Sequence, residues 1–368
     1  MRQRLVLILK LLVAAGLIVW LVQSGKIDFQ QLYRLRQGWP WFLAALVPFG
    51  LVLFICACRW RLLLRAQGLD YSTAEAYSRT MIGFFFNQFL IGTTGGDLVK
   101  AYMVASEQPG RRSAAVMSVF VDRALGLLVL VAVAMVAIAF NVRLVLSQPW
   151  LKYLAVLVVS IFFGSLLCGY VFYSERVRSL SPVRWLLARL PFRGALRTVS
   201  QAVYVYKFHP REVRMSVLLS ILVHLLIVLM HMFLACALVA GPVNWVSFFF
   251  LIPVAQIAMA IPVNPPGALG TGEWMYQTLL KLGAGIADGA LICILQRLVN
   301  YTWALVGCTY YVRRQKKVAE AMGAARAAHG KDGGDEFLDR PGGIGPDEPA
   351  ADGSRSVRPQ VDAGARQA

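Results

Sequence analysis

Long apolar runs are the feature of this sequence that most restricts its fold. Several stretches of 18 or more residues contain almost no charged side chain. A helix of about 20 residues crosses the roughly 30 Å hydrocarbon layer of a membrane. With 58% hydrophobic residues and a mean hydropathy of +0.60, the chain also carries more apolar surface than one soluble core of its length buries. We therefore predict an all-α polytopic membrane protein.

The apolar runs fall into two length classes. Those long enough to cross predict six full transmembrane helices, at residues 5–22, 41–58, 113–140, 151–173, 215–240 and 286–312. The first run resembles a signal peptide, but no small-x-small cleavage site follows it, so we interpret it as a retained helix. Shorter arms at 76–89 and through Lys100 to Ser106, and at 245–261 and 269–282, predict two re-entrant helical hairpins. Hydropathy alone would count seven or eight helices.

The basic residues indicate orientation. The formal charge is +18, but the basic residues lie between apolar runs and form no separate domain, which argues against a nucleic-acid partner. By the positive-inside rule they mark cytoplasmic loops and place both termini in the cytoplasm. They are Arg2 and Arg4, then Arg59, Arg61 and Arg65, then nine residues within 176–214, then Arg313, Arg314, Lys316 and Lys317. The segment 174–214 is also amphipathic, which predicts helices in the membrane interface that either anchor to anionic lipid or bind a substrate head group.

A polar, glycine-rich break occurs twice. Asn87 opens the first break and Asp97 closes it ten residues later, while Asn264 opens the second and Glu273 closes it nine residues later. Arg123 follows Asp97 by 26 residues and Arg297 follows Glu273 by 24. Positive-inside orientation requires the two hairpins to enter from opposite faces. This pattern predicts an inverted repeat with halves at about 41–140 and 215–312, as in many transporters.

Carboxylates at membrane depth are candidates for function. Asp97, Asp122, Glu273 and Asp288 lie there, and a charge at the bilayer centre costs roughly 2.5–3.5 kcal/mol unless it pairs or faces water. We expect Arg123 and Arg297 either to pair with these carboxylates or to bind a head group. The second arm of each hairpin begins near Asp97 or Glu273, where free N–H groups suit an anion, or where the carboxylate itself caps the helix. The predicted substrate-binding residues are Asn87, Gly95, Gly96, Asp97, Lys100, Asp122, Arg123, Asn264, Gly267, Gly270, Glu273 and Arg297, with Lys100 steering anionic lipid from the cytoplasmic side.

Three ordered motifs resemble a known family. They are Asn87-x-Phe-Leu-x-Gly-x-x-Gly-Gly-Asp97, Asp122-Arg123-x-x-Gly126 and Ile261-Pro-x-Asn-x-x-Gly-x-Leu-Gly-x-x-Glu273. They are similar to the flippase-like membrane family that includes the transmembrane region of lysylphosphatidylglycerol synthases, over nearly all of the chain up to about Val312. The resemblance implies a bacterial or archaeal cytoplasmic-membrane protein with re-entrant segments that translocates lipid. The large soluble aminoacyl-transferring domain of those synthases is missing, so lysyl-lipid synthesis is not implied, and the substrate is open to other lipids, such as a glycolipid, a polyprenyl lipid or a hopanoid.

Three functional hypotheses follow. The first is a flippase for a polar or anionic lipid, and the second is a membrane-embedded transferase that uses two carboxylates for acid/base chemistry. The third is a membrane scaffold for a lipid-synthesising enzyme. We expect no cofactor, because the segment ending at Lys100 lacks the Gly-Lys-Ser/Thr of a phosphate loop, and no metal, because the six cysteines have no partner at ligand spacing. His224 and His231 are expected to form interhelical hydrogen bonds, with a proton relay as the alternative.

The C-terminal part of the chain differs in composition. After Val318 the sequence is rich in Ala, Gly, Asp and Arg and has few apolar residues beyond Met322. We therefore expect a membrane domain at 1–318 and a disordered cytoplasmic tail at 319–368.

Overall fold

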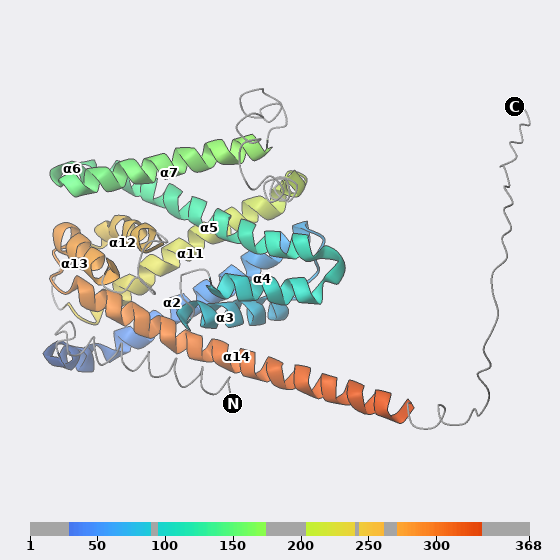
Figure 1. The fold of residues 1–368 in the computed structure, drawn as a ribbon. Coiled ribbons are helices and arrows are strands. Elements are labelled where there is room, and N and C mark those ends of the chain that lie inside the picture. Colours follow the sequence, from blue (N-terminus) through green and yellow to red (C-terminus); the bar gives the residue numbers. More distant parts are fainter. Residues whose placement is uncertain (1–28, 90–94, 174–203, 240–242, 261–270, 333–368) are drawn as a thin grey trace, which may run out of the picture. The chain divides into compact units, whose positions relative to one another are not determined.

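The computed structural model describes residues 29–89, 95–173, 204–239, 243–260 and 271–332. The elements within these residues are helical, which confirms the all-α prediction (Figure 1). They are α2 (Phe29–Ala66), α3 (Thr73–Phe89), α4 (Gly95–Glu107), a 3-10 turn η1 (Pro109–Arg111), α5 (Arg112–Phe140), α6 (Val142–Ser147), α7 (Pro149–Tyr173), α11 (Pro210–Cys236), α12 (Trp245–Ala260), α13 (Thr271–Ala284) and α14 (Gly289–Asp332).

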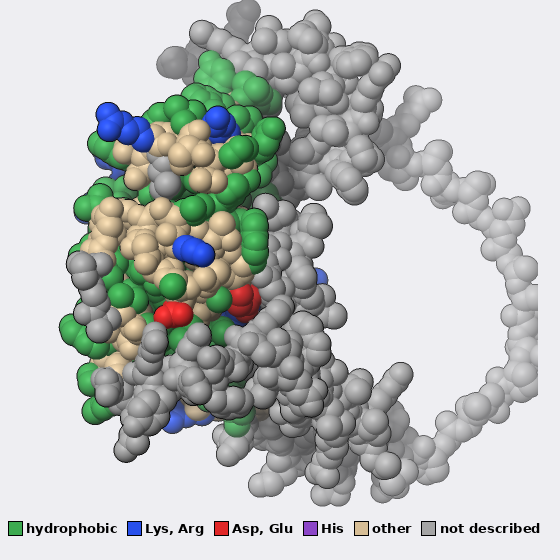
Figure 2. Space-filling model, turned by 90° about the vertical axis from the view of Figure 1, so that its left-hand side faces the viewer, with side chains coloured by type: hydrophobic (Ala, Val, Ile, Leu, Met, Phe, Trp, Pro, Cys, Tyr) green, Lys and Arg blue, Asp and Glu red, His purple; other side chains and the backbone are tan. Residues whose placement is uncertain are grey.

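Five of the described helices are long and apolar enough to cross a membrane. They lie at Gly38–Ala66, Arg112–Phe140, Pro149–Val171, Pro210–Cys236 and Gly289–Gln315. These helices coincide with five of the six predicted spans, while the first predicted span, 5–22, lies outside the described residues. On the face drawn in Figure 2, hydrophobic side chains surround a few isolated basic and acidic ones. The chain is therefore a multi-pass membrane protein.

The two predicted hairpins are antiparallel helix pairs. In the first, α3 and α4 lie side by side (Figure 1). Arg79 of α3 pairs with Glu107 of α4, and further along α3 Asn87 contacts Gly96 at the other end of α4. The second hairpin contains α12 and α13, and it is described in the next section. The four arms have 17, 13, 16 and 14 residues. At 1.5 Å per residue, each arm is about 20–25 Å long and therefore shorter than the hydrocarbon layer.

Local sequence signals explain where the first hairpin begins. Gly68, with φ of 72°, ends α2, and the Leu69 N–H bonds the Leu64 carbonyl in the pattern of a C-terminal cap. Ser72 and Glu75 then form a capping box: the Ser72 N–H donates to the Glu75 carboxylate at 2.9 Å, and the Glu75 N–H donates to the Ser72 hydroxyl at 3.2 Å. These caps satisfy the orphan backbone groups of two helix ends and set a tight turn between α2 and α3.

Three described helices extend beyond the bounds expected from the sequence. Helix α2 continues to Ala66, so Arg59 belongs to the helix and not to a cytoplasmic loop, because Trp60, Leu63 and Leu64 are buried and extend its packed face. Helix α11 begins at Pro210, within the segment predicted to lie in the interface; residues 174–203 of that segment lie outside the described residues. Helix α14 continues to Asp332, where a disordered tail was expected from 319, since its alanine-rich sequence favours a helix.

Candidate functional site

The tip of the first hairpin is held by a glycine contact and a side-chain cap. A Cβ atom on Gly96 would lie 1.8 Å from the Gly83 carbonyl oxygen, so only glycine lets the two arms approach this closely. The Gly96 N–H donates to Asn87 Oδ1 at 2.7 Å, which satisfies a free N–H of the first turn of α4. Asn87 therefore supplies the cap oxygen to Gly96, a role that the sequence had offered to Asp97.

Asp97 is left to pair across helices. Its carboxylate forms an ion pair with Arg123 of α5. The Asp97 side chain is 18% exposed and the Arg123 side chain is 53% exposed. Arg123 lies eleven residues into a 29-residue span, about 16 Å along the helix from Arg112. A guanidinium this exposed and this deep in a membrane span requires water or a polar group beside it.

The second hairpin repeats the ion pair. Glu273, in the first turn of α13, pairs with Arg297 of α14 at 3.1 Å, and both side chains are largely buried. A Cβ on Gly272 would lie 3.2 Å from both the Arg297 guanidinium and the Met259 methyl group of α12, so glycine again keeps the hairpin close to the arginine. Each hairpin carboxylate thus pairs with its downstream arginine, which is one of the two roles expected of Arg123 and Arg297.

A second charged cluster is fully buried between α2, α4, α5 and α11. Arg59 Nε donates to Asp122 Oδ1 at 2.8 Å, and Arg59 Nη1 donates to the Ser220 hydroxyl at 2.9 Å. Lys100 Nζ lies 3.9 Å from Asp122 Oδ2 and 3.7 Å from the centre of the Trp60 ring. Arg59, Lys100 and Asp122 are each 5–6% exposed. Lys100 therefore faces the protein interior, and its expected role in steering anionic lipid from the cytoplasmic side stays a prediction.

A directed hydrogen-bond chain connects the second hairpin to α11. His231 Nδ1 lies 2.7 Å from the Ile227 carbonyl oxygen, which can only accept, so this nitrogen carries the proton of the neutral ring. Nε2 then accepts from the Tyr276 hydroxyl at 2.8 Å, and Tyr276 accepts from Gln256 of α12 at 3.4 Å. His224 of α11 similarly lies 3.4 Å from the Gly126 carbonyl oxygen of α5. Both histidines thus form the predicted interhelical hydrogen bonds.

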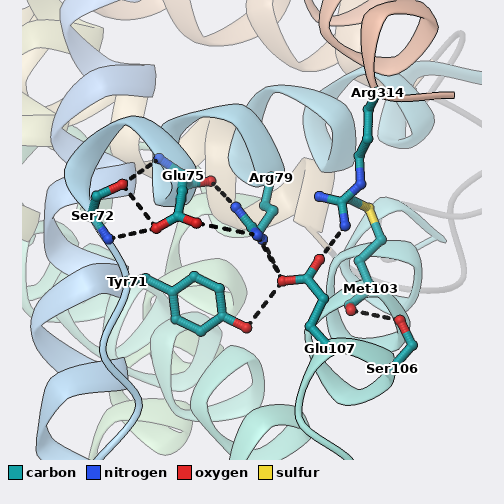
Figure 3. Close-up of polar contacts among 8 residues, drawn as sticks. All are labelled: Tyr71, Ser72, Glu75, Arg79, Met103, Ser106, Glu107 and Arg314. Carbon is teal, nitrogen blue, oxygen red and sulfur yellow. Dashed lines mark hydrogen bonds and ion pairs between the residues drawn. The ribbon is translucent and has the colours of Figure 1, made fainter. Parts of the chain in front are cut away.

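The end of the first hairpin opposite its tip carries a further cluster (Figure 3). Arg79 donates to Glu107 at 2.7 and 2.9 Å, the Tyr71 hydroxyl donates to it at 3.0 Å, and Arg314 of α14 pairs with its other carboxylate oxygen. Burial raises the pKa of the Glu107 carboxyl, but the hydrogen bonds and charges of the two arginines lower it more, so its pKa lies below the ordinary value. This Glu107 cluster connects the hairpin to the last membrane span.

Most of the predicted site residues meet in two groups. Those of the first half come together, namely Asn87, Gly95, Gly96, Asp97, Lys100, Asp122 and Arg123, and Glu273 meets Arg297 in the second. Asn264, Gly267 and Gly270 lie outside the described residues. The sequence analysis did not predict that Arg59 and Ser220 belong to this site. A signal for Arg59 was present, because an Asp122 carboxylate inside the membrane requires a basic partner. In the part of the chain that the structure describes, no group of three His, Cys, Asp or Glu side chains could hold a metal ion.

Comparison with known proteins identifies the family. The family model described as the lysylphosphatidylglycerol synthase TM region matches residues 7–307, which include both hairpins and four of the five described spans in full. No curated protein and no solved structure matches the chain. Because the match covers most of the sequence, this chain belongs to the family of the lysylphosphatidylglycerol synthase transmembrane region.

Proposed function

We propose that this protein moves a polar or anionic lipid between the leaflets of the bacterial or archaeal cytoplasmic membrane. The family is named for the transmembrane part of a lipid-modifying enzyme, which favours lipid handling. The observation that carries the proposal is the ion pair at the start of the second hairpin arm, Asp97 with Arg123, and its repetition by Glu273 with Arg297. A structural salt bridge alone would not require Arg123 to be half exposed in the middle of a span.

The ion pairs suit a head-group exchange. A lipid phosphate that reaches Arg123 replaces the Asp97 carboxylate as its counter-ion, because guanidinium binds both groups through the same charge-assisted hydrogen bonds. The released Asp97 lies one helical turn from Lys100 on α4. The charge of Asp97 therefore stays compensated while the head group occupies the arginine.

The repeat supports movement across the membrane. With both termini in the cytoplasm, the two hairpins enter from opposite faces as re-entrant segments, and each brings a carboxylate–arginine pair toward the membrane centre. A head group is then passed from one pair to the other as the cavity opens to each leaflet in turn. This arrangement of related sites at a repeat interface is that of secondary transporters.

The direct test is lipid movement in reconstituted vesicles. Purified protein is placed in phosphatidylcholine vesicles with a head-group-labelled lipid, and a membrane-impermeant quencher reports the fraction in the outer leaflet over time. Wild type should accelerate exchange. Arg123→Ala should slow it by about 10- to 150-fold, since a hydrogen bond to a charged group contributes about 1.5–3 kcal/mol. The matched control is Arg143→Ala, which removes an exposed arginine of α6 and should leave the rate unchanged.

The alternatives predict different products. A transferase would convert the labelled lipid into a new compound, which thin-layer chromatography of the same vesicles would reveal. A scaffold would neither move nor convert lipid, and its intramembrane charges would be replaceable. In cells that lack the protein, loss of one lipid from the outer leaflet at an unchanged total amount would support translocation and would name the substrate.

A further inference from the structure

The charges that meet around Lys100, which is itself 5% exposed, do not balance. Among the described residues that meet there, Arg59, Lys100 and Arg123 are basic, while Asp97 and Asp122 are acidic. If all five are ionised, the group carries a surplus of one positive charge. An uncompensated charge is unfavourable away from water, so the surplus must be removed or matched.

Lys100 is the member that holds the surplus. Arg59 forms a hydrogen bond of 2.8 Å with Asp122, and Arg123 forms an ion pair with Asp97. Lys100 is left with the second oxygen of Asp122 at 3.9 Å, beyond hydrogen-bond distance, and with the uncharged face of Trp60. Arginine does not lose its proton in proteins, whereas a buried lysine does. Of the three cations, Lys100 is the one able to change its charge.

Within the residues that the structure describes, the other elements around Lys100 supply no further negative charge. From α2, Trp60 lies against Lys100 and the thiol of Cys56 lies nearby, and from α5 Asp122 and Arg123 lie nearby. From α3 it is faced by Gly83, whose added Cβ would lie 3.4 Å from the Lys100 Cβ. On its own helix Asp97 precedes it by one turn. Any additional negative charge must come from outside these residues.

We propose that Lys100 is a proton-binding site whose protonation is coupled to occupancy of the Arg123 site by an anionic head group. The inference rests on the proposed function and adds its energy coupling. In the empty state Lys100 is a neutral amine, and the two arginines balance the two carboxylates. When a head group with a net negative charge, such as that of phosphatidylglycerol, binds Arg123, its charge is matched because the Lys100 amine takes one proton from water and becomes an ammonium. The group is neutral in both states, so one proton enters with each anionic head group.

The first experiment measures proton uptake on binding. Wild type in phosphatidylcholine nanodiscs, in weakly buffered solution with a pH indicator, is mixed with short-chain phosphatidylglycerol as the anionic probe. Wild type should take up protons as the probe binds, and short-chain phosphatidylcholine should cause no uptake. Lys100→Met should abolish the uptake. The matched control Lys152→Met, at an exposed position of α7, should retain it. Binding without uptake, uptake that survives Lys100→Met, or no binding of phosphatidylglycerol would overturn the proposal.

The second experiment separates coupling from transport itself. In phosphatidylcholine vesicles with head-group-labelled phosphatidylglycerol, a gradient of one pH unit should change the initial rate of wild type by up to about tenfold and should not change the rate of labelled phosphatidylcholine. Movement that ignores the gradient would refute the coupling and leave translocation standing. If no lipid moves, the proposed function fails, while proton uptake on binding still decides the role of Lys100. Should Lys100→Met fail to fold, the contrast between the two probes in wild type gives the answer.

Discussion

Removal of the Asp122 carboxylate tests the charge arrangement of the buried cluster most sharply. At a pH low enough for Lys100 to carry its proton, Asp122→Asn keeps the shape of the side chain but leaves the Arg59 and Lys100 cations without the carboxylate that lies beside both of them. Both cations are nearly inaccessible, at 6% and 5% exposure. Breaking a buried ion pair by removing one partner costs roughly 3–5 kcal/mol. Because two cations lose the same partner, we expect a loss near the upper end of that range.

The effect of the second substitution, Lys100→Met, on the free energy of unfolding depends on whether the Asp122 carboxylate is present. Lys100→Met alone should change the free energy of unfolding by less than about 1 kcal/mol, because Arg59 still holds Asp122 through its 2.8 Å hydrogen bond. In the Asp122→Asn background at the same pH, at which Lys100 is protonated, this change removes one of two uncompensated cations. It should therefore recover about 1–3 kcal/mol, the usual size of coupling between residues in one charge network.

The assay is reversible unfolding in mixed micelles, followed by tryptophan fluorescence as the fraction of denaturing detergent rises. The four variants of the cycle are compared with Asp70→Asn, which removes an exposed carboxylate and should match wild type. If Asp122→Asn lies within about 0.5 kcal/mol of wild type, the carboxylate does not hold the two cations together. Purely additive losses in the double variant at this pH would show that Lys100 carries no charge there, which would contradict its role as a proton-binding site.

Three further predictions concern other parts of the fold. Gly96→Ala should destabilise the protein by about 3 kcal/mol or more, because its methyl group would meet a backbone oxygen of the facing arm, whereas Gly110→Ala, with open space around it, should be neutral in the same thermal unfolding measurement. Tyr276→Phe should cost about 1–2 kcal/mol by leaving its buried histidine partner without a donor, and Tyr153→Phe, 77% exposed, is its control. Because the pKa of Glu107 is lowered in the folded protein, its carboxylate stabilises the fold above the unfolded-state pKa of about 4.3, and this stability is lost as the pH falls through the folded-state pKa. Glu107→Gln should therefore make the melting temperature less dependent on pH on the acid side. An unchanged dependence would contradict this.

The spans and hairpins follow closely from local sequence. Five predicted crossings and all four hairpin arms coincide with helices, because run length alone separates a segment that crosses from one that turns back. The pairing of Asp97 with Arg123 was predictable as well, since a carboxylate inside a membrane must have a partner and the same spacing recurs in the second half. Both inferences follow from the membrane as solvent, because it sets the length of a crossing segment and the free-energy cost of an unpaired charge.

The partners of Asp122 and Glu107 did not follow from local sequence. Arg59 lies 63 residues before Asp122, and Arg314 lies 207 residues after Glu107. The residues that flank Arg59 and Arg314 in the sequence do not distinguish these two arginines from basic residues of cytoplasmic loops, which the positive-inside rule counts. Asn87 shows the same limit at short range, because its role as the cap depends on how closely Gly83 and Gly96 allow the two arms to pack.

The sequence by itself determined that the chain lies in a membrane, where it crosses, where the arms of the two hairpins lie, and that charged residues occur at membrane depth. Each of these depends on transfer of a segment from water to lipid, which is a property of composition and length. Only the tertiary structure decided which charges meet, that two cations share one carboxylate, and that Lys100 is turned inward. These facts depend on distances between helices remote in the chain, and a difference of a few ångströms there decides whether a charge is paired or left over.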